Sequence, residues 1–196
     1  MAPRTRELLI SAAAELLDAG GREAVTLREV GHRAGVSHNA PYKHFANKEA
    51  LLAGVAAREL TQLGASLAAL SQRDLPADAV LRAALREYVG WALAYPARFA
   101  LVFSPWTAEF GDLATAADSS RSTLLGIVEA AQRAGQLPSG DTERVTGLLQ
   151  AVVHGAVDLA VIGHLAVGGK GNADPDGLVD DLLGYLRASA AIVTSA

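Results

Sequence analysis

Apolar side chains recur every three or four residues along most of the chain, and no stretch alternates apolar and polar residues as a strand would. Residues 5–19 carry such a stripe and are followed by Gly20-Gly21, which predicts a helix that ends there. Longer helices are predicted over residues 48–70, 141–167 and 175–193. We therefore expect an all-α protein.

The stretch from residue 26 to residue 45 predicts two short helices joined by a sharp turn. Thr26 is placed to cap a helix that runs to about residue 34, and Glu29 can complete a capping box. Gly35 suits the turn because glycine adopts positive φ without a steric penalty, and Ser37 is placed to cap the second helix. This pattern is typical of a helix-turn-helix that places its second helix in a DNA groove. The side chains expected to face outward are Ser37, His38, Asn39, Tyr42, Lys43 and His44.

The same stretch resembles the N-terminal domain of TetR-type transcriptional regulators. Two positions depart from that pattern, because Gly31 stands where the family usually has alanine and Pro41 where it usually has a large apolar residue. A proline in the first turn of a helix loses little hydrogen bonding, but it restricts where that helix begins. The matching positions are Thr26, Val30, Ala34, Gly35, Val36, Ser37, Tyr42, His44, Phe45, Lys48, Glu49 and Leu51.

The resemblance implies a role in DNA binding for several of these side chains. Their chemistry suits it, since asparagine pairs with adenine through two hydrogen bonds and lysine donates to guanine. Arg4 and Arg6 can add contacts from an N-terminal arm. The positions implied to contact phosphates are Thr26, Arg28, Tyr42, His44 and Lys48, and the positions implied to read bases are His38, Asn39 and Lys43.

Composition and charge limit the remaining possibilities. The 196 residues are 51% hydrophobic, which is enough for a sizeable core, and the absence of cysteine excludes disulfides and thiol catalysis. Nothing at the N-terminus resembles a secretory signal, so we expect a cytoplasmic protein. The net charge is −4, divided into +1 for residues 1–50 and −5 for residues 51–196. We expect a weakly basic DNA-binding domain over residues 1–50, which needs a second copy for affinity, and a ligand-binding and dimerisation domain over residues 51–196.

Seven of the ten aromatic residues lie between positions 88 and 110. Their spacing puts most of them on one face of helical segments that Pro96 and Pro105 interrupt. Such a cluster is either a core seam of a helical bundle or a pocket for an apolar or aromatic small molecule. The rings are Tyr88, Trp91, Tyr95, Phe99, Phe103, Trp106 and Phe110, of which we assign all but Tyr88 to a candidate effector pocket.

His154 and Asp158 are four residues apart on the predicted helix 141–167 and therefore share a face. They either hydrogen bond to each other or contact the ligand. His164 lies about 240° further round the helix than Asp158, so no metal site is expected, and neither is a cofactor. Polar residues and glycines interrupt this apolar run, so no membrane span is expected.

A second resemblance concerns the C-terminal part of the chain. Tyr95-Pro96-x-x-Phe99 and Val153-His154-Gly155 look like the C-terminal domain of one TetR-type subclass, although the tryptophan that often precedes the His-Gly pair is absent. In that family the last two helices of each subunit form a four-helix dimer interface. The resemblance therefore implies that helices 141–167 and 175–193 form one here.

Together these patterns predict a homodimeric transcriptional repressor that binds a palindromic operator and is released by a small apolar or aromatic effector. One alternative is a helical small-molecule-binding protein whose helix-turn-helix is structural or docks protein. Another is a small helical enzyme that uses His154 and Asp158 as an acid/base pair. The sequence offers no nucleophile arrangement, phosphate loop or metal set for such an enzyme, so we expect none.

Overall fold

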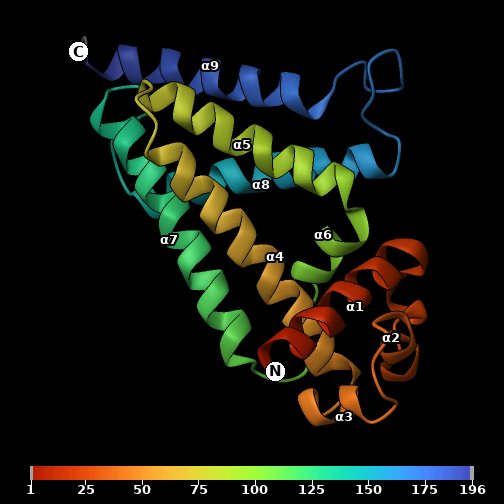
Figure 1. Cartoon of the computed structure of the whole chain (residues 1–196). Coiled ribbons are helices and arrows are strands. Elements are labelled where there is room, and N and C mark those ends of the chain that lie inside the picture. The colour runs from red at the N-terminus through yellow and green to blue at the C-terminus, as the bar shows by residue number, and fades with distance from the viewer. Residues whose placement is uncertain (1, 195–196) are drawn as a thin grey trace. The chain divides into compact units, whose positions relative to one another are not determined.

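A computed structural model describes residues 2–194, with side chains described for residues 4–191. Within that range the chain is helical and contains no strand, which confirms the predicted all-α class (Figure 1). The helices are α1 (Ala2–Ala24), α2 (Leu27–Arg33), α3 (Ala40–His44), α4 (Lys48–Ser71), α5 (Ala77–Ala94), α6 (Pro96–Val102), α7 (Gly111–Arg133), α8 (Thr142–Val161) and α9 (Pro175–Thr194).

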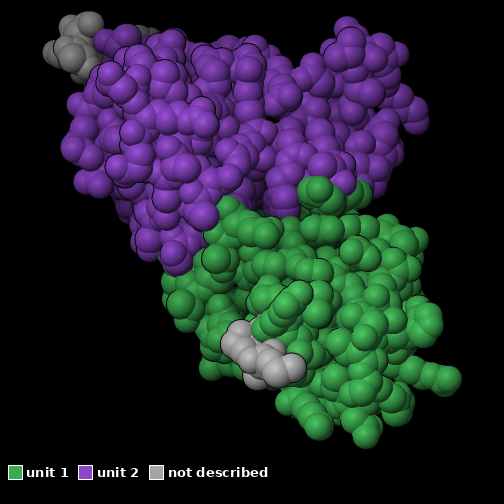
Figure 2. All heavy atoms as spheres, viewed as in Figure 1, with its two compact units in different colours: residues 1–62, 95–118 green, residues 63–94, 119–196 purple. Residues whose placement is uncertain are grey.

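The chain divides into two compact units that do not follow sequence order (Figure 2). Unit 1 consists of residues 1–62 and 95–118, and unit 2 consists of residues 63–94 and 119–196. Helix α6 therefore belongs to the same unit as α1, α2 and α3, while α4 and α7 each contribute residues to both units. The predicted division after residue 50 stays a prediction.

The core of unit 1 is built by α1, which packs against α2, α3 and α6. Its apolar stripe is buried as the periodicity predicts, with Leu9 and Leu17 almost fully covered. The regular helix breaks at Gly20-Gly21, where Gly21 adopts a φ of +65°, and one more helical turn leads to Ala24. A residue with a side chain would be strained at this φ, so the predicted end of the first long helix is confirmed.

The first half of the helix-turn-helix follows the sequence prediction. The Thr26 hydroxyl accepts a hydrogen bond from the backbone N–H of Glu29 at 3.1 Å and so caps α2. After α2 the backbone turns at Gly35, whose φ is +64°. Val30 is fully buried beneath the turn, as its place in the apolar pattern requires.

The second helix begins later than predicted, and the prediction that Ser37 caps it is wrong. Helix α3 starts at Ala40, and Asn39 occupies the capping position. The Ser37 carbonyl instead accepts the N–H of Ala40 at 2.9 Å, so residues 37–40 form a turn. Pro41 lies in the first helical turn, where its missing N–H leaves no intrahelical bond unmade.

The two departures from the family pattern contact each other. A β-carbon placed on Gly31 would lie 3.0 Å from Cγ of Pro41 and 3.4 Å from its Cδ. Both residues are buried. The missing side chain on α2 thus provides the space into which the proline ring of α3 packs, which keeps the two helices in contact.

In unit 2, α5, α8 and α9 contact one another and run side by side (Figure 1). Their core side chains include the fully buried Leu81, Val89 and Leu149. Ion pairs join α5 to α9 as well, because Asp180 binds Arg86 at 2.6 Å and also pairs with Arg82.

Helix α8 is shorter than the predicted helix over residues 141–167. It begins after Asp141, whose carboxylate accepts the N–H groups of Glu143 and Arg144, and it ends at Val161. Gly163 follows with a φ of +75°, which a right-handed helix cannot continue through. Among the described helices, α8 alone has the length and apolar composition of a membrane span, a test that core helices of soluble proteins also pass.

Candidate DNA-binding surface and effector region

Helix α3 has one buried side and one exposed side. Pro41 and the following Phe45 are buried, whereas Tyr42 is 54% exposed and Lys43 is exposed beside it. The His38 ring meets the Tyr42 ring edge-on, with centroids 5.9 Å apart. The exposed side therefore presents an aromatic pair and a cation, a combination that suits contacts with phosphates and base edges.

The side chain of Asn39, the residue before α3, is not used to cap that helix. Asn39 is exposed, and its side chain makes no capping hydrogen bond to α3. An asparagine that does not cap its own helix can offer its amide oxygen and its NH₂ group to a base edge. Ser37 and His38 are exposed in the same turn.

Two helix N-termini in unit 1 carry residues that are predicted to contact phosphates. The Thr26 hydroxyl accepts from Glu29, so its own proton is left to donate, and Arg28 is exposed in the first turn of α2. At α4, the Asn47 side chain accepts the N–H of Ala50 at 2.8 Å, and Lys48 is half-buried in the first turn. Helix N-termini carry partial positive charge and bind phosphate.

The structure places all the predicted DNA-binding residues in unit 1, on α2, α3, the connection between them and the start of α4. His44 and Lys48 are half-buried, and the others are exposed. These residues are Thr26, Arg28, Ser37, His38, Asn39, Tyr42, Lys43, His44 and Lys48.

Arg6 is engaged within unit 1 rather than extended as an arm. Its guanidinium lies 2.8 Å from the Asp112 carboxylate and 5.5 Å from the centroid of the Phe45 ring. Arg4 on the same helix is exposed. The N-terminal part of α1 is therefore joined to the start of α7.

The segment between α6 and α7 binds the start of α4 and the end of α1. Thr107 donates its backbone N–H to Glu49 at 2.8 Å and its hydroxyl to the other carboxylate oxygen. These two hydrogen bonds, the hydroxyl foremost, lower the pKa of Glu49 below its usual value. Arg22 donates to the Ser104 hydroxyl at 2.9 Å and lies over the Trp106 ring.

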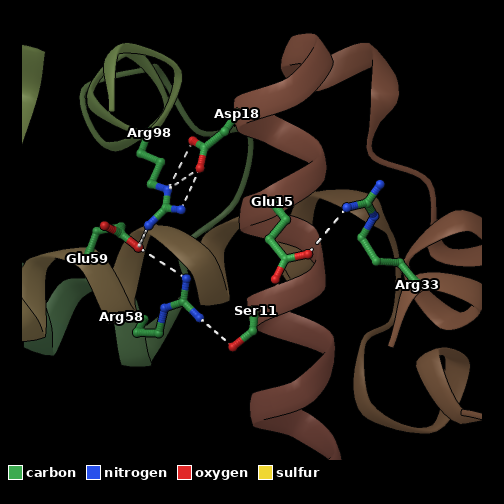
Figure 3. Close-up of polar contacts among 7 residues, drawn as sticks. All are labelled: Ser11, Glu15, Asp18, Arg33, Arg58, Glu59 and Arg98. Atoms are coloured by element: carbon green, nitrogen blue, oxygen red, sulfur yellow. Dashed lines mark hydrogen bonds and ion pairs between the residues drawn. The ribbon is translucent and has the colours of Figure 1, made fainter. Parts of the chain in front are cut away.

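A charged network fixes α6 to α1 and α4 (Figure 3). The Arg98 guanidinium donates to Asp18 on α1 through Nε at 3.0 Å and pairs with Glu59 on α4 at 3.3 Å. Glu59 is only 3% exposed and also pairs with Arg58 at 3.2 Å. Burial alone would lower the pKa of Arg98, but the bonds and charges of Asp18 and Glu59 raise it, so the arginine stays charged.

The sequence analysis did not single out this network, although it contains a signal for it. Glu59 follows Val55 and precedes Leu63 at helical spacing, so a carboxylate occupies the apolar stripe of α4. A buried carboxylate requires a cation or donors. The partner is harder to find, because Arg98 is 39 positions away and only the fold brings it to Glu59.

The predicted effector residues fall into both units. Trp91, His154 and Asp158 lie in unit 2, and the other five lie in unit 1. Within unit 1, Phe99 and Phe103 have ring centroids 5.2 Å apart, and Phe99 is buried. The rings in unit 1 are Tyr95, Phe99, Phe103, Trp106 and Phe110. That all these side chains line one effector pocket stays a prediction.

In unit 2 the polar contact of His154 is with α5. His154 Nδ1 lies 2.8 Å from the Tyr88 hydroxyl, which makes a hydrogen bond, whereas His154 Nε2 is 3.6 Å from the Asp158 carboxylate. His154 thus hydrogen bonds to Tyr88, which is outside the set of residues assigned to the effector pocket, and lies near Asp158 without a hydrogen bond to it at that distance. That His154 or Asp158 contacts an effector stays a prediction. Burial, and then the charge of Asp158, raise the pKa of Tyr88, so its hydroxyl is neutral. The Trp91 ring is 6.1 Å from that of Tyr88.

Among the residues whose structure is described, no three histidine, cysteine or acidic side chains gather as a metal site would require. A helix-turn-helix followed by a helical bundle, with an exposed polar side on the second helix of the motif, is the architecture of helical DNA-binding regulators.

Comparison with known families agrees with this class. Residues 9–55 match the family described as bacterial regulatory proteins, tetR family, and residues 81–186 match the tetracyclin repressor-like C-terminal domain. The chain is a transcription regulator of the TetR family.

Solved structures with the same fold include one of a protein of unknown function from Rhodococcus sp. RHA1. It is 30% identical, 94% of each chain is covered, and the TM-score is 0.79. The regulator FadR from Bacillus subtilis in complex with stearoyl-CoA is 17% identical, with 92% of this chain and 96% of that one covered and a TM-score of 0.66. RolR in complex with resorcinol is 20% identical, with coverage of 96% and 92% and a TM-score of 0.67. No protein with a curated functional description matches the sequence.

Proposed function

We propose that this regulator is a homodimeric repressor that binds a palindromic operator through α3 and is released by a small apolar or aromatic effector. The observation that carries the proposal is the exposed side of α3, where Tyr42 and Lys43 stand beside an Asn39 amide that caps no helix. Two recognition helices about one DNA turn apart, roughly 34 Å, read a palindrome in such dimers.

The charge distribution supports a dimer as the DNA-binding form. The first fifty residues carry a net charge of only +1, so a single head gains little from phosphate attraction. Two heads on one operator add their specific contacts, and the second binds at high effective concentration.

An exposed apolar face on α8 and α9 supports the same oligomeric state. Leu148, Val152 and Leu159 are 50%, 37% and 44% exposed, and their spacing puts them on one side of α8. On the neighbouring α9, Tyr185 is 75% exposed. Pairing this face with its copy in a second subunit would form a four-helix interface that removes the apolar area from water.

For effector binding we propose the region of unit 2 around Tyr88 and Trp91 on α5 and His154 and Asp158 on α8. A ring face, a neutral hydroxyl and an imidazole are the groups that hold an apolar ligand with one or two polar atoms. A ligand that prefers one arrangement of α5 and α8 would weaken DNA binding, and by linkage DNA would weaken ligand binding by the same factor.

Gel shifts of the full chain with the DNA upstream of its own gene test the proposal. We expect a sequence-specific complex that salt weakens. The Tyr42→Ala and Lys48→Ala double variant should lose affinity for every sequence, whereas Asn39→Ala should alter sequence preference by about 1–3 kcal/mol at one base pair.

Lys170→Ala is the matched control, because it removes one positive charge from an exposed residue of unit 2 and should leave binding unchanged. Absence of a specific complex with any upstream DNA would favour the alternative of a small-molecule-binding protein. Unaltered binding by both the double variant and Asn39→Ala would show that another surface binds DNA.

A further inference from the structure

A cavity of about 250 Å³ lies within unit 1 next to the last residue of the recognition helix, His44. Its lining comes from α1 and the α3–α4 region, including Arg6 and Phe45, and from the start of α7, including Phe110 and Asp112. An apolar cavity of about 150 Å³ is large enough to bind benzene, so this volume has room for a ligand with one substituted ring.

Two aromatic rings in the lining of the cavity, Phe45 and Phe110, are held in place by neighbouring residues. A β-carbon on Gly54 would lie 3.3 Å from the Phe45 ring, so the missing side chain lets that ring pack closely on α4. The Arg6 guanidinium lies over the same ring. Phe110 is held by an edge contact with Trp106, at a centroid distance of 5.9 Å. Fixed aromatic rings in the lining favour a flat apolar ligand.

The polar end of the cavity is an ion pair that is open to solvent. Arg6 Nη2 lies 2.8 Å from Asp112 Oδ2, and the two side chains are 36% and 77% exposed. An anionic ligand would be attracted by Arg6 and repelled by Asp112. A cationic ligand would be attracted by Asp112 and repelled by Arg6. A hydroxyl group is matched to both, because it accepts from a guanidinium N–H and donates to a carboxylate oxygen.

We propose that this cavity is a second small-molecule site that binds an uncharged, single-ring aromatic compound with a hydroxyl group. The ring packs against Phe110 and the accessible part of Phe45, and the hydroxyl bridges Arg6 and Asp112. The site is distinct from the effector region around His154 and does not depend on it. His44 belongs both to the cavity lining and to the proposed DNA-binding surface, so binding of the ligand should change the affinity for the operator, and the reverse. This linkage rests on the proposed DNA binding.

Fluorescence of full-length protein tests the site with phenol, benzoate and benzylamine as probes. The Trp91→Phe variant retains Trp106 as its single tryptophan, which contacts Phe110. We expect a saturable change with phenol, and affinities about fivefold weaker for benzoate and benzylamine, because each loses one of the two hydrogen-bond partners.

Substitutions within this Trp91→Phe background locate the binding. Ala50→Leu fills the cavity from α4 and should abolish the phenol signal, whereas Ala65→Leu, on an exposed part of the same helix, should not. Asp112→Ala removes the carboxylate and should reverse the preference from phenol to benzoate, whereas Asp118→Ala, an exposed aspartate further along α7, should preserve it.

A phenol signal that does not saturate, or that Ala50→Leu leaves intact while circular dichroism shows the native fold, overturns the proposal. The proposal is also overturned if Asp112→Ala leaves the preference for phenol over benzoate unchanged. Operator DNA should weaken phenol binding in the Trp91→Phe protein. If phenol binds as described and DNA has no effect, the site stands and its linkage to the DNA-binding surface is wrong.

Discussion

Gly31 on α2 and Pro41 on α3 form one packing unit, in which a β-carbon at position 31 would lie 3.0 Å from the proline Cγ. Each residue departs from the family pattern, and the structure shows that the departures compensate each other. The space that the glycine leaves is filled by the proline ring. The effect on stability of replacing either residue therefore depends on the residue at the other position.

A double-mutant cycle at these two positions measures that compensation. Alanine stabilises a helix by about 1 kcal/mol relative to glycine. At position 31, however, its β-carbon would press on the proline ring, and this contact should destabilise the fold by roughly that amount or more. We therefore expect Gly31→Ala to be neutral or destabilising in the native protein and stabilising by about 1 kcal/mol in a Pro41→Ala background. Urea denaturation of the four proteins gives the coupling, and additive effects would contradict the packing argument.

Loss of Arg98 should weaken unit 1. Its removal takes one cation away from the buried Glu59 and leaves Arg58 beside it, so we expect Arg98→Ala to reduce the unfolding free energy by about 2 kcal/mol, somewhat less than for a fully orphaned buried charge. Thermal and urea unfolding measure the change.

The combined Arg98→Met and Glu59→Leu variant is the control, because it removes both charges and keeps their volume. It should be more stable than Arg98→Ala alone, since apolar pairs replace buried ion pairs at little cost. An equal loss in both variants would assign the effect to the ion pair itself rather than to a buried carboxylate left without Arg98, because the double variant keeps the packing.

The contact between Glu49 and Thr107 predicts a pH dependence in the acid range. Hydrogen bonds from Thr107 lower the pKa of Glu49 in the folded protein, so this contact stabilises the fold above the usual pKa of 4.5 and is lost as the pH falls through the lower, folded value. The stability difference between the native protein and Glu49→Gln should therefore be present at neutral pH and vanish in strong acid. Glu109→Gln, at an exposed position on the α6–α7 segment, should show no comparable difference.

Charge on the exposed face of α8 should separate the proposed dimer. Val152→Glu puts a carboxylate in the middle of the apolar face between Leu148 and Leu159, where pairing with a second copy would bury it. Light scattering should report a dimer for the native chain and a monomer for the variant, with unchanged helix content. Gln136→Glu, outside α8 and α9, is the matched charge control, and a monomeric native chain would contradict the proposed interface.

The fold was predictable from the sequence because its signals are local. Apolar stripes, the cap at Thr26 and the glycine turn at Gly35 each depend on residues within a few positions, and the structure shows all three. The start of α3 was misplaced because two capping signals competed. Ser37 is a good capping residue, but Pro41 determines which residues occupy the first turn.

The contacts that involve side chains far apart in sequence were not predictable. His154 shares a helix face with Asp158, so the sequence indicated that pair, yet its hydrogen bond goes to Tyr88 on α5, 66 positions away. The aromatic spacing between residues 88 and 110 likewise indicated one cluster. It could not show that the chain passes from unit 2 to unit 1 after Ala94, within that stretch.

Unit 1 is assembled from two separate pieces of the chain, and this restricts how such regulators can be recombined. A chimera that took residues 1–62 from this protein and the rest from a relative would leave behind Arg98, the partner of Asp18 and Glu59, and Thr107, the partner of Glu49. In such a chimera the buried Glu59 would lose Arg98, and this pairing would be restored only if the relative supplies a cation at that position. A transferable DNA-binding module must therefore carry residues 95–118 with it, and a new specificity cannot be grafted as one continuous N-terminal segment.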